Sequence, residues 1–467
     1  MPIAFTFTRL QPANRVSGSE FPALPSAVNV TCPGCGCLCD DVRLTIDGHE
    51  LHEFEPGCEL GRRWFQQHLQ PAEFTTSVDG ISVSHVEAVR RAVELLRRAD
   101  NPLIYGLSRS ATPGQRAAVA LADHLGAVID STASLCHGPS IMALQEVGEV
   151  TCTLGEVRNR ADLVIFWGCH PAASHPRHAE RYSVSAAGRF TRAGRASRRV
   201  VMIGEANHVH DWKLSPGGEQ PDLVIPVEAD GDFELIAQLR CILREGEAPA
   251  EPLSRRSHTP SVSPPVRQLV ELIRASHYGI VFFGLGLSGS RMWEGNQTIR
   301  AGHVQVAALL QLVAELNAVT RFTARRMRMQ GDVSGADNVL LWQTGYPFAV
   351  DFSRGYPRYN PGEFSANEVL ERGEADACVL VGAETIPYFS PAARAHLRSI
   401  PTIVLDYPGV PLEFTPTVRF TTAVYGLHAA GTAYRMDNVP LPLQAICPSD
   451  LPTDEAVLTA LANGCTS

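Results

Sequence analysis

Six apolar runs rich in β-branched residues recur along the chain, and most of them end in glycine. They are "PLIYGLS" from Pro102, "ADLVIFWGCHP" from Ala161, "RRVVMIGEA" from Arg198, "GIVFFGLGLSGS" from Gly279, "ADACVLVGAETIP" from Ala375 and "IPTIVLDYP" from Ile400. Such runs are typical of buried parallel strands that enter a loop at their carboxyl end. Between them, residues 83–99 and 303–319 repeat apolar side chains at about 3.6-residue spacing, which predicts helices. The pattern therefore predicts an α/β protein with doubly wound sheets.

The order of these runs repeats. A strand ending in Gly-x-Ser, a strand opening with Ala-Asp and a third short strand occur once before residue 210 and once after residue 278. We interpret this order as two related α/β units, each with a ligand crevice beyond its strand ends. The alternative is that any two α/β domains share such an order.

Three stretches lack this pattern. Residues 1–27 hold no continuous apolar segment before a small-residue cleavage site, so they predict a flexible polar leader rather than a signal peptide. Residues 244–265 are rich in proline and serine, which predicts an exposed flexible insertion. Residues 441–467 predict a C-terminal tail with one short helix and a fraying end.

Composition and charge narrow the class of protein. With 467 residues, 45% of them hydrophobic and 19% charged, the chain has the composition of a globular protein with two or more domains. A formal net charge of −9 offers no electrostatic footprint for nucleic acid, and no apolar run approaches the ~20 residues of a membrane span. We therefore expect neither nucleic acid nor a membrane as partner, and a reducing cytoplasm as the location.

Five of the twelve cysteines lie between Cys32 and Cys58. In a reducing compartment such a cluster more often binds metal than forms disulfides. Cys32, Cys35 and Cys39 are spaced C-x2-C-x3-C, and three close thiolates with Cys58 as a distant fourth fit a [4Fe-4S] cluster. Zinc fits less well because its usual sites hold two close pairs. Buried free thiols are the remaining alternative, and Cys37 is interpreted as a packing residue.

The loops after the predicted strands carry further reactive side chains. "STASLCHGPS" puts the thiol of Cys136 beside the imidazole of His137 in a turn. Three interpretations are open: a nucleophile and its base, although adjacent side chains diverge; a soft metal ligand with an acid–base group beside it; and a packed structural cysteine.

Basic and glycine-rich loops suggest anion binding. The segment after the second strand is dense in basic side chains suited to a polyanion such as a pyrophosphate, with zinc as an alternative: His170, His175, Arg177, His178 and Arg181. Glycines in "GLGLSGS" let backbone amides approach a phosphate, but the full dinucleotide fingerprint is absent, so NAD is not expected. The plain interpretation of the next basic group is a solvated helix end that carries Arg325, Arg326 and Arg328. The aromatic residues 344–363 predict an ordered functional segment.

Together these motifs resemble the molybdopterin oxidoreductases. More closely, "CHGPS", "ALQEVG", "TCTLGEVRNRADLVIFWGCHP", "SHPRHAERYS", "GYPFAVDFSRGYPRYNPGE" and "RGEADACVLVGAE" resemble the B subunit of formylmethanofuran dehydrogenase, over roughly residues 30–440. The resemblance implies an α/β fold with a small N-terminal iron-sulfur cluster domain and two interleaved doubly wound α/β domains of molybdopterin oxidoreductase type. The implied bounds are residues 28–75 for the cluster domain, 76–135 plus 335–440 for the first α/β domain and 136–334 for the second.

The resemblance also assigns roles to residues. It implies that Cys32, Cys35, Cys39 and Cys58 bind a [4Fe-4S] cluster, and that Cys136 binds a tungsten or molybdenum held by two pterin guanine dinucleotides. It makes His137 and Arg328 catalytic. The dinucleotide-binding positions that it implies are Gly168, His170, Pro171, Gly284, Gly286, Asp332 and Asp337. The family's histidine two residues after Arg328 is replaced here by Gln330.

The implied activity is formate dehydrogenase-like interconversion of CO2 and formate in one-carbon metabolism. His137 and Arg328 would handle the proton and the anionic carboxylate, since a fixed guanidinium can bind formate through two hydrogen bonds. The implied partners are an amidohydrolase subunit, a formyltransferase subunit and the C subunit of one complex, and a ferredoxin-like electron carrier. One alternative is a redox-inactive scaffold subunit of a formyltransferase/hydrolase complex, against which the retained cysteines argue. Another is a formate dehydrogenase acting alone, against which the short chain and the lack of a second cluster motif argue.

Overall fold

The computed structural model describes residues 26–71, 76–245, 263–289, 302–328 and 331–466. Most of the predicted leader 1–27 and of the predicted insertion 244–265 lies outside the described residues, and so does Gln330. Among the described residues, no helix has the length and apolar character needed to cross a membrane.

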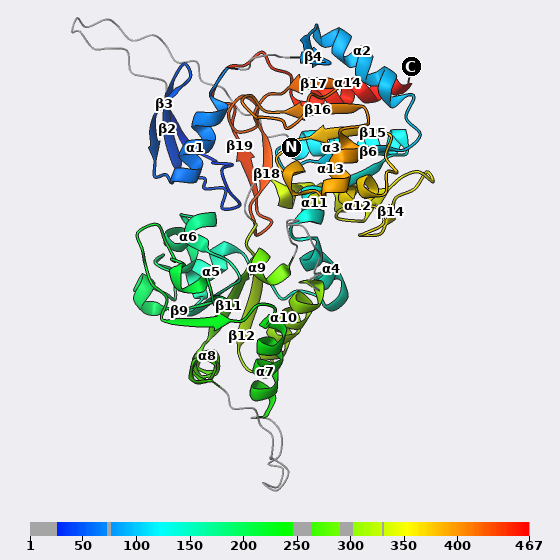
Figure 1. Cartoon of the computed structure of the whole chain (residues 1–467). Coiled ribbons are helices and arrows are strands. Elements are labelled where there is room, and N and C mark those ends of the chain that lie inside the picture. The colour runs from blue at the N-terminus through cyan, green and yellow to red at the C-terminus, as the bar shows by residue number, and fades with distance from the viewer. Residues whose placement is uncertain (1–25, 72–75, 246–262, 290–301, 329–330, 467) are drawn as a thin grey trace, which may run out of the picture.

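A small antiparallel unit opens the described chain. Its sheet has the order β1 (Ser26–Val30), β2 (Val42–Asp47) and β3 (Glu50–Glu55), and helix α1 (Glu59–His68) follows. The loop between β1 and β2 carries the first four cysteines, and its buried side chains share a core with Phe54 and Phe65. In Figure 1 this unit is the blue sheet set against the side of the two larger parts.

The largest sheet has nine strands in the order β14 (Arg358–Tyr359), β13 (Val350–Asp351), β7 (Val128–Ser131), β6 (Pro102–Gly106), β15 (Ala377–Val381), β16 (Thr402–Asp406), β17 (Val418–Thr421), β4 (Thr76–Val78) and β5 (Ile81–Ser82). The five strands from β7 to β17 run parallel, and the short outer strands pair antiparallel. The chain enters this sheet at the edge strands β4 and β5, continues through β6 and β7, leaves it, and returns at β13 and β14 before β15. The sheet therefore changes its winding direction between β6 and β15.

The second sheet has five parallel strands in the order β10 (Leu223–Val227), β9 (Arg199–Glu205), β8 (Leu163–Trp167), β11 (Tyr278–Phe283) and β12 (Arg321–Arg326). The chain winds outward from β8 to β10 and then returns to β11 on the other side of β8. The change of direction lies between β8 and β11, and such switch points are where open α/β sheets bind ligands.

Helices cover both faces of each large sheet (Figure 1). On the nine-stranded sheet, α2 (His85–Leu96), α3 (Thr112–Leu125), α11 (Val333–Thr344) and α14 (Asp454–Thr466) share one core, and α12 (Ala366–Glu371) and α13 (Pro391–Leu397) the other. On the five-stranded sheet, α7 (Asp232–Glu245), α8 (Pro264–Ala275) and α10 (Gly302–Leu316) lie opposite α5 (Leu154–Arg160). Because side chains alternate along a strand, Ile165 and Phe166 enter different cores.

Shorter elements complete the chain. They are α4 (Gly138–Val147), α6 (Pro171–Ser174), α9 (Leu285–Ser288), the hairpin β18 (Gly431–Tyr434) and β19 (Pro440–Leu443), the π-helix η2 (Ala179–Ser183), and the 3-10 turns η1 (Thr132–Leu135), η3 (Gly194–Ser197), η4 (Val209–Asp211) and η6 (Ile386–Tyr388).

The predicted α/β class with parallel sheets is confirmed. All six predicted strands are present as parallel strands of the two large sheets, and the helices predicted over 83–99 and 303–319 are α2 and α10.

The division into two sequential units is wrong as a division into sheets. The first repeat contributes β6 to one sheet and β8 and β9 to the other, because β6 pairs with the distant β15. The short helix predicted within 441–467 is α14, and its Val457, Leu458 and Leu461 are fully buried. The predicted domain bounds stay a prediction.

Candidate functional site

Each large sheet has a cavity at its switch point, as the sequence predicted for the strand ends. The β8–β11 cavity has a volume of about 330 Å³, and the β6–β15 cavity one of about 240 Å³. Of the residues expected to bind a dinucleotide, the first cavity is lined by Gly168, His170, Gly284 and Gly286. The second is lined by Asp332. Pro171 and Asp337 line neither cavity.

The β8–β11 cavity is formed by two loops in close contact. Gly168 has a φ of +61°, and a Cβ there would lie 2.5 Å from the backbone nitrogen of Leu287, so only glycine is compatible with this approach. Pro171 begins the short helix α6 just beyond. The His170 ring stacks on Trp212 with centroids 6.0 Å apart.

The opposite wall of this cavity is acidic. It is made by four carboxylates: Glu205 at the end of β9, Glu228 and Asp230 in the loop after β10, and Asp232 at the start of α7, which accepts from Nε1 of Trp167 at 2.7 Å. Carboxylates beyond strand ends accept hydrogen bonds from ribose hydroxyls or ring N–H groups, and a glycine turn leaves room for phosphate oxygens. The arrangement suits a nucleotide.

The β6–β15 cavity holds an ion-pair network instead. Nη1 of Arg109 donates to Asp406 at 2.9 Å, and its Nε lies 3.4 Å from Glu384. Ser108 donates to Glu384. Burial raises the pKa of Asp332 to about 8, which keeps this carboxyl largely protonated at neutral pH. The cavity also contacts the cysteine loop through Pro33 and Gly34.

His68, on the wall of the β6–β15 cavity, makes the stability of the chain depend on pH. Burial, with a smaller effect of the Arg109 charge, lowers the pKa of His68 from 6.5 to about 4. The stability that this neutral ring contributes is therefore present above pH 6.5 and lost as the pH falls toward 4. We expect wild type to lose about 1.4 kcal/mol of unfolding free energy per pH unit in this window relative to His68→Phe.

Urea unfolding of both chains at pH 7, 6 and 5 measures this difference. Buried carboxyls with raised pKa values, such as Asp332, act in the opposite direction but are present in both chains, so their effect cancels. A difference that stays constant from pH 7 to pH 5 would contradict the prediction.

Four predicted site residues meet between the two cavities. Cys136 follows η1, and His137 caps the N-terminus of α4. Nη1 of Arg328 donates to Asp337 of α11 at 2.5 Å, and the other oxygen of Asp337 accepts from Ser131 at 3.0 Å. Both members of the ion pair have only 9% of their side chains exposed. Elements of both sheets therefore supply one buried polar cluster.

The charged groups of this cluster shift one another's pKa values. Burial raises the pKa of Cys136 to about 11, and the guanidinium of Arg328 opposes that rise. Burial would lower the pKa of Arg328, but Asp337 and Cys136 outweigh it and raise the value. His137 has its pKa lowered well below the usual range by burial and then by Arg328 and Arg326, so its ring is neutral.

Two buried polar atoms near this cluster have no hydrogen-bond partner among the described residues. One is Nε2 of His137, whose Nδ1 lies 3.2 Å from Ser140 Oγ. The other is Oε1 of Glu149, whose second oxygen accepts from Arg326 at 2.9 Å. Buried polar atoms are rarely left unpaired in folded proteins, so they point to a bound polar group or water here.

The cysteine loop closes one side of the site. Cys32, Cys35 and Cys39 are buried, Cys58 is half-buried at the N-cap of α1, and none forms a disulfide. Burial and the charges of Cys39, Cys35 and Cys58 raise the pKa of Cys32, so the four thiols lie within electrostatic range of one another. Cys37 is fully buried, and its thiol hydrogen-bonds to Cys35.

The described residues offer no site for a single metal ion, but the cysteine loop fits an iron-sulfur cluster. Within the described ranges, no group of three or more His, Cys, Asp or Glu side chains is arranged to hold a single metal ion. In a [4Fe-4S] cluster, however, each cysteine binds a different iron, so the thiols do not converge on one ion. The donor chemistry, four free thiols in one buried loop system, fits such a cluster.

Gly36 brings the cysteine loop against the Arg328 cluster. A Cβ at Gly36 would lie 2.1 Å from the carbonyl oxygen of Arg328 and 3.4 Å from Nε2 of His175, which itself lies 2.6 Å from that oxygen. The two candidate metal-binding regions are therefore adjacent through backbone contact.

Gly36→Ala is expected to destabilise the chain by about 1–3 kcal/mol, because the loop or Arg328 must move to admit the methyl group. Gly155→Ala is the matched control. Its Cβ would meet nothing closer than 3.6 Å in helix α5, so alanine there should be neutral or stabilising by about 0.5–1 kcal/mol. Urea unfolding measures both. A Gly36→Ala chain as stable as wild type would show that this contact is looser than described.

Two interpretations of basic residues are wrong. Arg177 and Arg181 bind Asp41 and Asp40 of the cysteine loop, so their charges are used within the protein and not by a polyanion. Arg325 and Arg326 lie on strand β12 and are buried rather than at a solvated helix end, because the segment pairs with β11.

The structure also places the two remaining histidines of the segment after β8 and the aromatic segment 344–363. His175 and His178 are fully buried. The aromatic segment 344–363 is ordered, as predicted, and its Tyr359 hydroxyl donates to Gln145 of α4 at 2.8 Å. It packs against the helix that begins beside Cys136.

Sequence reasoning missed several residues of the site. Arg109, Glu384 and Asp406 lie at three strand ends of one sheet, but no short motif joins them. The repeated Gly-x-Ser strand end was a usable signal, because Ser108 lines the β6–β15 cavity. Glu149 carried no signal, since its partner Arg326 is 177 positions away.

Comparison with known proteins finds two relatives that share one description. The B subunit of tungsten-containing formylmethanofuran dehydrogenase 2 from Methanocaldococcus jannaschii is 36% identical over 442 residues, 93% of this chain and 97% of that protein. The protein of the same description in Methanococcus maripaludis is 34% identical over 442 residues, with the same coverage. No family model matches the chain.

A second group of relatives is more distant. The B subunit of the formyltransferase/hydrolase complex Fhc of Methylorubrum extorquens is 26% identical over 314 residues, 64% of this chain and 72% of that protein. The crystal structure of the FhcABCD complex with methylofuran from that organism contains a chain that matches with a TM-score of 0.65 and 23% identity, over 83% of this chain and 98% of that one. This structural likeness establishes a shared fold.

Proposed function

Because the chain belongs to the family of formylmethanofuran dehydrogenase B subunits, we propose that it interconverts CO2 and formate within a multisubunit complex of one-carbon metabolism. The observation that carries the proposal is the meeting of Cys136, His137 and the Arg328–Asp337 pair between two switch-point cavities, with the cysteine loop against Arg328.

The chain has a residue set for each group that this reaction needs. Cys136 would bind tungsten or molybdenum, and the two cavities would take the nucleotide ends of two pterin guanine dinucleotides. Cys32, Cys35, Cys39 and Cys58 would bind a [4Fe-4S] cluster. When bound, the metal–pterin group supplies two-electron oxidation–reduction and the iron-sulfur cluster supplies single-electron transfer.

Arg328 acts on the substrate carboxylate. Asp337 holds one edge of its guanidinium at 2.5 Å and is itself held by Ser131, so the side chain is fixed before substrate arrives. A fixed guanidinium in a buried site binds an anion more strongly than one in water, and its remaining N–H groups can donate to formate.

His137 acts on the proton. Reduction of CO2 to formate takes up two electrons and one proton, so the site needs a group that can hold that proton. The ring of His137 is neutral, so in the tautomer whose Nδ1 donates to Ser140, Nε2 has its lone pair available to take up a proton in transit and pass it on rather than to store it. Burial of His137 and Arg328 keeps bulk water away from this exchange.

Partners follow from the same proposal. The chain would work with an amidohydrolase subunit that joins formate to a carrier amine, a formyltransferase subunit, the C subunit and a ferredoxin-like electron carrier. Its relatives are described as B subunits of formylmethanofuran dehydrogenase and of the Fhc complex, which supports a role as one subunit of an assembly.

Metal analysis of the complex, purified without oxygen, tests the proposal. We expect about four iron atoms and one tungsten or molybdenum per chain, together with pterin. A well-folded complex that contains neither iron nor tungsten nor molybdenum would reject it in favour of a redox-inactive scaffold. The identities of 34–36% to the tungsten-containing subunits, against 26% to the Fhc subunit, favour the redox-active form.

A further inference from the structure

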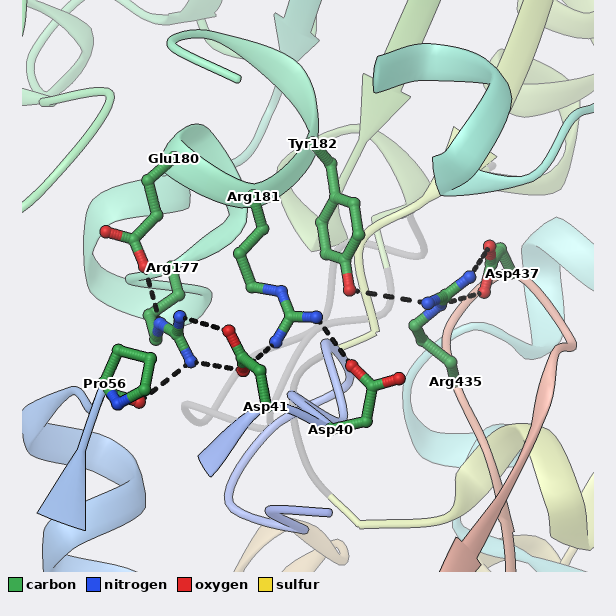
Figure 2. A network of polar contacts seen from close by, with 9 residues as sticks. All are labelled: Asp40, Asp41, Pro56, Arg177, Glu180, Arg181, Tyr182, Arg435 and Asp437. Atoms are coloured by element: carbon green, nitrogen blue, oxygen red, sulfur yellow. Dashed lines mark hydrogen bonds and ion pairs between the residues drawn. The ribbon is translucent and has the colours of Figure 1, made fainter. Parts of the chain in front are cut away.

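Arg177 and Arg181 of the segment after β8 reach into the cysteine loop. Arg177 donates to both carboxylate oxygens of Asp41, at 2.8 and 2.9 Å, and Arg181 donates to Asp40 at 2.6 Å and to Asp41 (Figure 2). Asp40 and Asp41 directly follow Cys39 in the chain. We call these four charged residues the arginine clasp.

Arg177 also contacts the second cysteine segment. Its Nη1 donates to the carbonyl oxygen of Pro56 at 2.9 Å, two residues before Cys58 (Figure 2). Its Nε donates to Glu180 at 2.5 Å, and only 7% of its side chain is exposed. A planar guanidinium with four such bonds has a fixed orientation, which a flexible ammonium does not. One side chain therefore joins the loop that bears Cys39 to the segment that bears Cys58.

The clasp is braced from the other side. The Tyr182 ring lies between the guanidiniums of Arg181 and Arg435, each 5.3 Å from its centroid, and Figure 2 shows the three side chains in a row. The backbone nitrogen of Met436 donates to the carbonyl oxygen of Gly36 at 2.9 Å. The cysteine loop is thus held between the π-helix η2 and the turn that follows β18.

The two arginines are also the cations that act on the buried thiols. Both guanidiniums lie within electrostatic range of the Cys39 thiol, and they bind Asp41 and Asp40, the residues that follow it. Thiolates bound to iron carry negative charge, and a nearby fixed cation stabilises it. The segment from Arg177 into η2 therefore supplies geometry and charge together.

We propose that Arg177 and Arg181 are positioning residues for the iron-sulfur cluster: Arg177 holds the two cysteine segments together, and Arg181 supplies positive charge that favours the reduced cluster. This inference rests on the proposed function for the presence of the cluster. It concerns residues that touch neither the CO2–formate site nor either cavity.

The role of Arg181 is tested by the midpoint potential of the cluster in the purified complex. Arg181→Met should shift the potential to more negative values with iron content retained, because a cation beside the thiolates is lost. Arg181→Lys should restore most of the shift. Arg195→Met is the control, since Arg195 makes comparable ion pairs with Asp222 and Glu219 away from the cysteine loop. A loaded Arg181→Met complex with the wild-type potential would overturn this part of the inference.

The role of Arg177 is tested without the cluster, by the alkylation rate of the loop cysteines in the full complex after iron removal, followed peptide by peptide. Arg177→Met should raise the rates of Cys32, Cys35 and Cys39 about tenfold or more, because the loop opens more often. Arg195→Met should leave them at the wild-type value. Equal rates in Arg177→Met and wild type would overturn the clasp. This readout holds even if the wild-type complex proves to contain no iron, so failure of the clasp and failure of the proposed function are distinguishable.

Discussion

Cys136→Ser is expected to lower CO2–formate interconversion by at least about 100-fold and to remove tungsten or molybdenum from the complex, while iron stays at its wild-type content. The hydroxyl of serine is a harder and more weakly bound donor than a thiolate, so the heavy metal loses its protein ligand. Cys136 lies after η1, outside the cysteine loop, so the iron site should be unaffected. Formate oxidation with a dye acceptor and elemental analysis of the same sample measure both effects.

Cys447→Ser is the matched control for this variant. Cys447, like Cys136, is half-buried and forms no disulfide, and it lines neither the β8–β11 nor the β6–β15 cavity. It should keep full activity and full metal content. If Cys136→Ser retained its heavy metal and its activity, Cys136 would be a packed structural cysteine, and the proposed site would have to be abandoned.

Arg328→Met is expected to show two large effects. It should lower kcat/KM for formate by about 100- to 1000-fold, because the buried donor for the carboxylate is lost. It should also lower the free energy of unfolding by about 3–5 kcal/mol, because Asp337 is left as a buried carboxylate without its cation. Kinetics with formate and guanidinium unfolding measure the two effects on the same protein.

The double variant Arg328→Met/Asp337→Asn separates them. It removes the unpaired charge together with the cation, so most of the stability should return while the activity stays low. Arg328→Lys keeps the charge without the planar fork and should fall between wild type and Arg328→Met. Recovery of activity in the double variant would mean that Arg328 serves stability alone and does not bind the substrate.

Local pattern accounts for the elements that the sequence could predict. The strands at Ala161 and Gly279 are apolar on both faces, and a strand covered on both sides has a continuous apolar run as its sequence. The spacing of the cysteine loop is likewise local. Its thiols lie together in the structure because Cys39 is only seven positions after Cys32, and the two backbones are joined by a hydrogen bond of 2.8 Å.

Long-range pairing accounts for the errors. The basic residues after β8 look like an anion site on the sequence alone, because nothing local indicates that Asp41, 136 positions from Arg177, will take its charge. For the same reason the sequence predicts a solvated Arg326. In the structure its strand β12 pairs with β11, and the side chain is buried. The local sequence of a charged segment does not show which group its side chains will pair with, because that partner is brought near only by the tertiary structure.

The sequence by itself determined the strands, the main helices, the cysteine spacing and the family, since each depends on residues close in the chain or on long matching strings. Tertiary structure alone decided which strands share a sheet, because β6 pairs with β15 across some 270 residues of intervening chain. That pairing sets the two switch points and their cavities. It also brings Cys136, Arg328 and Asp337 from separate elements into one buried cluster, where the exclusion of water makes their charges strong enough to act on a small anion.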